Sequence, residues 1–174
     1  TSNTLWKKEN SPYHIVQDIS VYKGAELSIE QGVDLILRED VNVYIKGQLN
    51  ISGTNNEKVV FRPEGKQWGE LHLYGKENKN VINNVIFKEG VFRSSETDVT
   101  LLNTIFRVKD KNLIYDGYRQ AVVWVKGGVF NMDKCQLYSN GTGEGMNINF
   151  AEVEIKNSYF NNAPDAIEVM NVTK

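Results

Sequence analysis

The densest group of residues able to do chemistry lies between residues 107 and 120, where the sequence reads RVKDKNLIYDGYRQ. Hydrolysis of a glycosidic bond needs two carboxyl groups roughly 5–9.5 Å apart, and lyase chemistry needs an acid-bound cation beside a basic side chain. This stretch and the residues just after it offer both kinds of group. The candidates for a catalytic centre are Asp110, Asp116, Arg119 and Lys126. A solvated surface loop explains the same residues without catalysis and is the simpler interpretation.

A second group of polar residues repeats at a fixed interval near the C-terminal end. Glu144 precedes Asp165 by 21 residues, and Asn147 precedes Glu168 by the same 21 residues. If the chain coils with that period, each pair lies side by side, and their oxygens could share a Ca²⁺ ion. The candidate metal ligands are therefore Glu144, Asp165 and Glu168, and we expect no other cofactor. Turn carboxylates that face water and repel each other modestly are the alternative.

Aromatic residues form the third group. Exposed aromatic rings beside Asn and Asp are typical of sugar-binding surfaces, because a pyranose ring offers an apolar face together with hydroxyl groups. The aromatic residues considered are Trp68, Trp124, Tyr74, Tyr115, Tyr118, Tyr138 and Tyr159. Alternation along the strands turns Trp124 and Tyr159 outward. The predicted binding residues are Trp124, Tyr115, Tyr118 and Tyr159. Two alternatives explain the same residues. One is an oligomer interface, which uses the same residue types, and the other is a set of aromatic side chains scattered under loops with no binding role.

Composition excludes several classes of protein. The chain has 174 residues, 40% hydrophobic and 24% charged, with a net charge of −2, which is ordinary for a globular domain and gives nucleic acid no basic surface to bind. A single cysteine, Cys135, excludes an internal disulfide, and two histidines make a His-rich zinc site untenable. No apolar run reaches the roughly 18 residues of a membrane-spanning helix, so we expect no membrane insertion.

One half-polar hexamer recurs four times in the chain. Its copies are INNVIF at 82–87, LLNTIF at 101–106, MDKCQL at 132–137 and IKNSYF at 155–160, at intervals of 19, 31 and 23 residues. The first position is always apolar, the fourth small and the sixth large and apolar. Positions four and six share one face of a strand, but position one falls on the other face unless the chain bends between them. Asn at position three suits a left-handed bend, so the hexamer predicts a strand, a one-residue corner and a second strand.

A corner that returns once per roughly 20–25 residues predicts a coiled solenoid of about 6–8 coils. Alternating apolar residues support strands throughout, which makes the fold all-β, a parallel β-helix spanning residues 1–174 as one domain. Phe87, Phe106, Leu137 and Phe160 should then form one inward column. Asn84, Asn103 and Asn157 should form a second column, in which Asn side chains can bond to one another, and Cys135 should face inward. A β-sandwich would need Asn-Gly hairpins at short intervals, and the chain has only Asn140-Gly141.

Two longer stretches resemble known β-helix proteins. SPYHIVQDISVYKGAELSIEQGVDLIL, residues 11–37, resembles the first coil of right-handed parallel β-helices of the pectate-lyase-like superfamily. GEGMNINFAEVEIKNSYFNNAPDAIEV, residues 143–169, is more similar to β-helix regions of bacterial cell-surface proteins, some of which carry CotH-kinase-like or lamin-tail domains. The usual Gly-Asp-Gly or Gly-Asp-Ala coil openings are Gly143-Glu144-Gly145 and Pro164-Asp165-Ala166 here, so the acidic character is partly kept. The resemblance implies a right-handed coil and many relatives that act on polysaccharides.

These observations predict a non-catalytic β-helix module of a secreted or cell-surface bacterial protein, serving as a rigid stalk or a binding surface for glycans. The alternative is a polysaccharide lyase or glycoside hydrolase acting on an acidic polysaccharide. The expected partners are a polysaccharide, or another protein chain at the C-terminal coil. The chain begins at Thr1 without Met and stops part-way round a coil at DAIEVMNVTK, so we expect a fragment or module of a larger protein.

Overall fold

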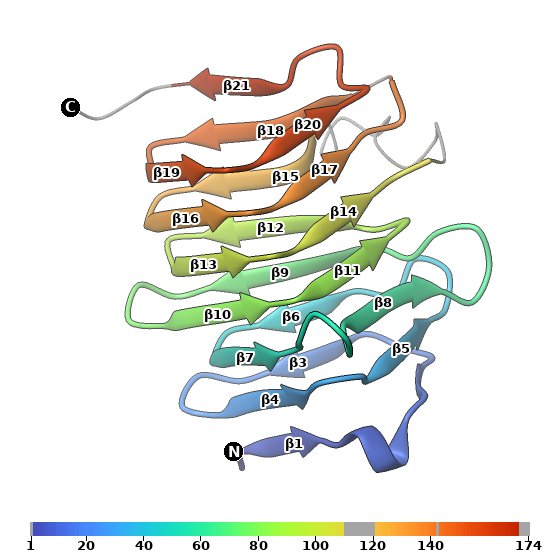
Figure 1. Ribbon diagram of the computed structural model, residues 1–174. Helices are drawn as coiled ribbons and strands as arrows, with labels where there is room; N and C mark the ends of the chain where they lie inside the picture. Colours follow the sequence, from blue (N-terminus) through green and yellow to red (C-terminus); the bar gives the residue numbers. More distant parts are fainter. Residues whose placement is uncertain (1, 110–120, 142, 171–174) are drawn as a thin grey trace.

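The computed structural model describes residues 2–109, 121–141 and 143–170, which wind into a β-solenoid built from three parallel sheets (Figure 1). In spatial order the first sheet contains β1 (Thr4–Trp6), β4 (Glu26–Glu30), β7 (Gln48–Ser52), β10 (Lys79–Asn83), β13 (Asp98–Leu102), β16 (Val129–Asp133) and β19 (Glu152–Lys156). The second sheet contains β2 (Tyr13–Ile15), β5 (Asp34–Leu37), β8 (Val59–Pro63), β11 (Val85–Lys88), β14 (Ile105–Arg107), β17 (Gln136–Tyr138) and β20 (Tyr159–Asn161). The third sheet contains β3 (Ile19–Val21), β6 (Val43–Ile45), β9 (Glu70–Tyr74), β12 (Val91–Ser95), β15 (Ala121–Lys126), β18 (Glu144–Asn149) and β21 (Ile167–Met170). One short 3-10 helix, η1 (Lys8–Asn10), precedes β2.

One strand from each sheet makes one coil. Neighbouring strands within a sheet are always three elements apart in the chain, as β4, β7 and β10 are. In Figure 1 the chain crosses the front through the first and second sheets, returns along the back through the third, and climbs with each circuit. That path is a right-handed coil. The predicted right-handed parallel β-helix of about six to eight coils is therefore confirmed, and each sheet has seven strands among the described residues.

At each of the four hexamers, a single residue in the left-handed conformation makes the bend between the first and second sheets. The φ angles at the four predicted corners are 55° at Asn84, 49° at Asn103, 55° at Lys134 and 49° at Asn157. Asn adopts this conformation more readily than other side chains. The predicted corner is confirmed at all four copies of the hexamer, and Lys134 shows that the position favours Asn without requiring it.

The predicted direct bonding between the corner Asn side chains is wrong. Asn103 donates to the side-chain oxygen of Asn83, which precedes the corner residue of the coil before, at 3.4 Å. Asn157 donates likewise to Asp133 at 2.8 Å. The corner side chain thus bonds to the last residue of the first-sheet strand in the preceding coil, and not to the corner residue of that coil. The corners are joined by a staggered ladder, whose acceptors are an amide in one coil and a carboxylate in another.

The core consists of side-chain columns that run along the solenoid axis. Successive register partners in the second sheet are Leu35, Phe61, Phe87, Phe106, Leu137 and Phe160. The rings of Phe87 and Phe106 stack with centroids 5.1 Å apart and planes 12° apart. The predicted inward column is confirmed, and it extends two coils further toward the N-terminus than the hexamers indicated.

Trp68, which the sequence grouped with the surface aromatics, belongs to this core. Its side chain is fully buried, its ring lies 6.0 Å from that of Phe61, and its indole N–H donates to the backbone oxygen of Lys88 at 2.8 Å. A Cβ atom at Gly90 would come within 2.0 Å of the indole ring, so that glycine leaves the space that the ring fills. The surface prediction for Trp68 was wrong because it lies in a connection outside the alternating strands.

Replacing Phe106 by Ala should lower the free energy of unfolding by about 3–5 kcal/mol, because the cavity removes contacts with the rings above and beside it. Urea denaturation followed by circular dichroism measures the change. Arg107→Ala, one residue away on the outer face, is the matched control and should change stability far less. Equal destabilisation by the two substitutions would contradict the inward column.

Candidate binding site

Most of the predicted catalytic residues lie outside the described residues. They are Asp110, Asp116 and Arg119. The same holds for two of the predicted binding residues, Tyr115 and Tyr118. Lys126 is described, and it is the exposed last residue of β15 in the third sheet.

The two described binding residues lie on different faces. Trp124, in β15 of the third sheet, points outward as predicted but is half-buried, and the guanidinium carbon of Arg93 lies 5.7 Å from the centre of its ring. Tyr159, in β20 of the second sheet, is 52% exposed. The structure therefore does not bring Trp124 and Tyr159 into one site.

Tyr159 belongs instead to a set of outward side chains on the second sheet. Because Phe106, Leu137 and Phe160 face inward, the residues on either side of each must face outward. The register places Arg107, Tyr138 and Asn161 side by side in three successive coils. A parallel row places Ile105, Gln136 and Tyr159 next to one another in the same coils.

The side chains of these two rows contact one another. The guanidinium carbon of Arg107 lies 5.4 Å from the centre of the Tyr138 ring, within the range of a cation–π contact. The rings of Tyr138 and Tyr159 meet edge to face, 6.1 Å apart. The Tyr138 hydroxyl donates to Gln136 Oε1 at 3.1 Å, and the Asn161 amide donates to the Tyr159 hydroxyl at 2.8 Å. Both tyrosines are thus held in place by hydrogen bonds.

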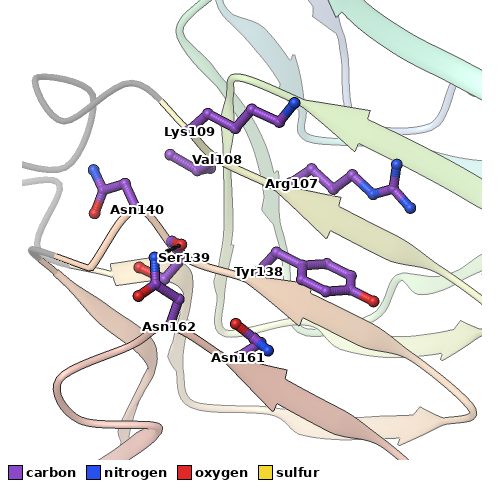
Figure 2. Close-up of a pocket in the computed structure, with 8 residues that line it drawn as sticks. All are labelled: Arg107, Val108, Lys109, Tyr138, Ser139, Asn140, Asn161 and Asn162. Atoms are coloured by element: carbon purple, nitrogen blue, oxygen red, sulfur yellow. Dashed lines mark hydrogen bonds between the residues drawn. The ribbon is translucent and has the colours of Figure 1, made fainter.

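A pocket of about 460 Å³ opens beside these rows, at the carboxyl ends of β14, β17 and β20 (Figure 2). The described residues that line it are Arg107, Val108, Lys109, Tyr138, Ser139, Asn140, Asn161 and Asn162. Asn162 has a left-handed backbone and donates its side-chain amide to the backbone oxygen of Ser139 at 3.1 Å. The pocket combines one aromatic face, two cationic side chains and several amide groups. In chemical terms it offers a stacking surface, hydrogen-bond donors and acceptors, and positive charge.

Sequence reasoning found Tyr159 and noticed Tyr138, but it missed Arg107, Asn161 and Asn162. The available signal was positional: Arg107, Tyr138 and Asn161 each follow directly after the sixth residue of a hexamer. Aligning the hexamers one residue further would have placed them in one row.

The predicted calcium ligands lie together in part. Asn147 and Glu168 are register partners, and the Asn147 amide donates to Glu168 Oε2 and to Glu144 Oε2, each at 2.8 Å. Asp165 contributes its backbone oxygen to the N–H of Gly145. Burial raises the pKa of Glu144, and the Glu168 and Asp165 carboxylates raise it further, while the Asn147 amide acts in the opposite direction. An amide donor therefore lies between the two carboxylates.

Within the ranges that the structure describes, no three His, Cys, Asp or Glu side chains are grouped so as to hold a metal ion. The residues predicted for Ca²⁺ show two carboxylates that already share the Asn147 amide. The calcium site stays a prediction, and binding of the ion there would require that amide to move or rotate.

Cys135 faces inward, as predicted. It is 1% exposed, and burial raises the pKa of its thiol to about 11. A thiol that stays protonated at neutral pH is a poor nucleophile and metal ligand. Its role is to fill the small position behind the corner.

Comparisons with protein-family models, with curated proteins and with solved structures gave no match. In the described part of the chain, none of the helices has the length and apolar character needed to cross a membrane. The function is therefore inferred from the geometry of the chain itself.

Proposed function

We propose that this β-helix is a glycan-binding module and that the second-sheet pocket around Tyr138 is its binding site. The observation that carries the proposal is the arrangement of Arg107, Tyr138 and Asn161 in one outward row, with Tyr159 beside them. A sugar ring needs an apolar surface to stack on and amide groups to bond its hydroxyls, and this row supplies both. The pocket volume of about 460 Å³ lies within the usual range for small-ligand sites.

Charge favours an acidic glycan. Arg107 and Lys109 line the pocket, and Lys88 precedes Arg107 in the same row. A guanidinium group can bind a carboxylate through two parallel hydrogen bonds, which suits a uronic acid. None of the described residues that line the pocket is Asp or Glu, so a polysaccharide with carboxylates would meet no like charge from them.

The same lining favours binding over cleavage. Hydrolysis of a glycosidic bond needs two carboxyl groups flanking it, and the described lining supplies neither. The polysaccharide lyase or glycoside hydrolase alternative depends on Asp110, Asp116 and Arg119, outside the described residues, with Lys126 on a different sheet. We therefore favour a module that holds a polysaccharide without cutting its backbone.

The resemblances of residues 11–37 and 143–169 support the wider setting that we propose, a bacterial protein that is secreted or displayed at the cell surface. The architecture suits a stalk, because each strand bonds to its neighbours along the axis and the coils cannot hinge without breaking those bonds. A stalk with one sugar-binding face would hold a polysaccharide at a fixed distance from whatever carries it.

Replacing Tyr138 by Ala should weaken binding of an acidic oligosaccharide by roughly 2- to 12-fold, since an aromatic contact contributes about 0.5–1.5 kcal/mol. A glycan array with neutral and uronic oligosaccharides identifies the ligand, and isothermal titration calorimetry measures the affinities. Tyr22→Ala is the matched control, because Tyr22 is 63% exposed and far from the pocket in the chain. Arg107→Gln should weaken binding of the uronic ligand more than that of a neutral one.

The proposal fails if no glycan on the array binds, or if Tyr138→Ala and Tyr22→Ala bind equally well. The same mixtures are assayed for unsaturated or reducing ends. Their release by the wild-type chain, and loss of that release in Asp116→Ala or Arg119→Ala, would favour the enzyme alternative.

A second contact is proposed at the coil formed by β19, β20 and β21. Among the described residues these strands pair on one side only, and open strand edges attract other strands. Apolar side chains are exposed on β21: Ile167 is 39% exposed, Val169 52% and Met170 41%. We propose that another polypeptide, in the simplest case a second copy, packs against this coil.

Sedimentation velocity at rising protein concentration tests this contact. A second copy that uses β21 should shift the chain toward dimer, and Val169→Asp should restore the monomer. A monomer at every concentration, with wild type and variant indistinguishable, would rule out self-association through this coil.

A further inference from the structure

The outer face of the third sheet carries a polar cluster that the glycan proposal does not use. Glu70, His72 and Tyr74 alternate outward along β9, and the register sets Arg93 beside His72 and Ser95 beside Tyr74 on β12. The second-sheet pocket shares no residue with this cluster.

Three of these residues form a relay of hydrogen bonds. His72 Nε2 lies 2.8 Å from Ser95 Oγ. His72 Nδ1 lies 3.2 Å from Glu70 Oε1. A hydroxyl, an imidazole and a carboxylate in this order are the nucleophile, base and orienting acid of serine hydrolases, which are recognised by geometry and not by chain order.

The contact between His72 Nδ1 and Glu70 favours a proton on that nitrogen. Glu70 can only accept a hydrogen bond as a carboxylate, so a hydrogen bond between the two needs Nδ1 to be the donor. The Tyr74 hydroxyl, 2.7 Å from the same nitrogen, can accept that hydrogen too. With its proton on Nδ1, the imidazole has a lone pair on Nε2 facing the Ser95 hydroxyl. This is the tautomer that a general base requires.

Surrounding contacts hold the imidazole and the carboxylate in place. The ring of Tyr74 stacks on His72 with centroids 3.8 Å apart. Arg93 Nε lies 2.7 Å from Glu70 Oε2, an ion pair whose angle is not that of a hydrogen bond. Burial raises the pKa of Tyr74, and the Glu70 charge adds to that shift, so the phenol stays neutral. The base is thus held on one side by an aromatic ring and on the other by a charge-paired acid.

The three side chains of the relay are all partly buried on the outer face of the third sheet. The side chains of His72 and Glu70 are 12% and 15% exposed, and Ser95, at the end of β12, is half-buried as well. Lys126 is the register partner of Ser95 in the next coil, and it is exposed. An ammonium group beside the nucleophile can stabilise the negative charge that develops on a carbonyl oxygen.

We propose that Ser95, His72 and Glu70 form a serine-type esterase site that hydrolyses carboxylic esters. Ser95 Oγ adds to the ester carbonyl carbon while its proton passes to His72 Nε2. The bond to the alcohol then breaks, and His72 returns that proton to the departing oxygen, leaving an acyl group on Ser95. Water adds to this acyl group and gives a proton to His72 Nε2. Ser95 leaves as the hydroxyl, taking that proton, and the carboxylic acid is released.

This activity goes beyond glycan binding, and it differs from the polysaccharide cleavage that the sequence left as an alternative. It cleaves no glycosidic bond. Glu70 is a positioning residue, because it acts through the imidazole, whereas Ser95 and His72 touch the reacting atoms.

A fluorophosphonate probe tests the nucleophile directly, because it labels only serines activated by a base. The full chain is incubated with the probe, and peptide mass spectrometry locates the label, with urea-unfolded chain as the blank. We expect the label on Ser95 alone, and none on the unfolded chain. Hydrolysis of p-nitrophenyl acetate gives the rate for the variants.

Ser95→Ala and His72→Gln should each lower the rate at least about 100-fold, the usual scale for loss of a nucleophile or general base. Ser28→Ala is the matched control, since the Ser28 hydroxyl donates to the Glu26 carboxylate without an imidazole between them, and it should leave the rate unchanged. Glu70→Gln should lower the rate, and Glu70→Asp should restore part of it, which loss of an ordinary surface contact would not do.

Wild-type chain that remains unlabelled, or a label spread over other serines, would overturn the proposal. So would labelling of Ser95 that His72→Gln does not reduce, provided that circular dichroism shows both chains folded. Failure here leaves the glycan proposal untouched, since Tyr138 and Ser95 lie on different sheets.

Discussion

Each strand of this protein takes its hydrogen bonds from strands one coil away along the axis, so no coil can satisfy its own backbone. The register between coils is therefore the constraint on which every other feature depends. It stacks Phe87 on Phe106 inside, and it aligns Arg107 with Tyr138 and His72 with Arg93 outside. A slip of one residue would send each of these side chains to the opposite face. Core and surface sites are consequently specified by the same alignment.

The inner columns could be predicted from the sequence because their chemistry is uniform. A position that is always apolar, or always small, identifies itself when the hexamers are aligned. The corner could be predicted too, since few residues accept a left-handed backbone and Asn occurs at three of four corners. The hydrogen bonds of the corner side chains could not be predicted. They depend on how the bend orients each side-chain amide, and that orientation leaves no pattern in the sequence. The burial of Trp68 could not be predicted for a related reason, since Trp68 fills the core from a connection between strands.

The outer faces were harder to predict, and for a physical reason. An outward position faces water in most coils, so its residue type is free to vary from one coil to the next. Tyr138 and Asn161 share a row and the position after a hexamer, but they share no chemical property that marks this position as part of a site. Alternation alone puts Glu70, His72 and Tyr74 on one face, but their meeting with Ser95 depends on the length of the coil between them. That length changes along the chain, as the intervals of 19, 31 and 23 residues show.

Cross-linking across the longest interval tests the coil register most directly. In a Cys135→Ala background, Ile105→Cys with Gln136→Cys places two cysteines on register partners, at a strand spacing of about 4.8 Å that a disulfide can span. Ile105→Cys with Tyr159→Cys places them two coils apart, at roughly 10 Å, which a disulfide cannot span. Mild oxidation followed by peptide mass spectrometry should find an internal disulfide in the first pair and none in the second. A bond in the second pair, or none in the first, would contradict the stacking on which the fold and both proposed sites depend.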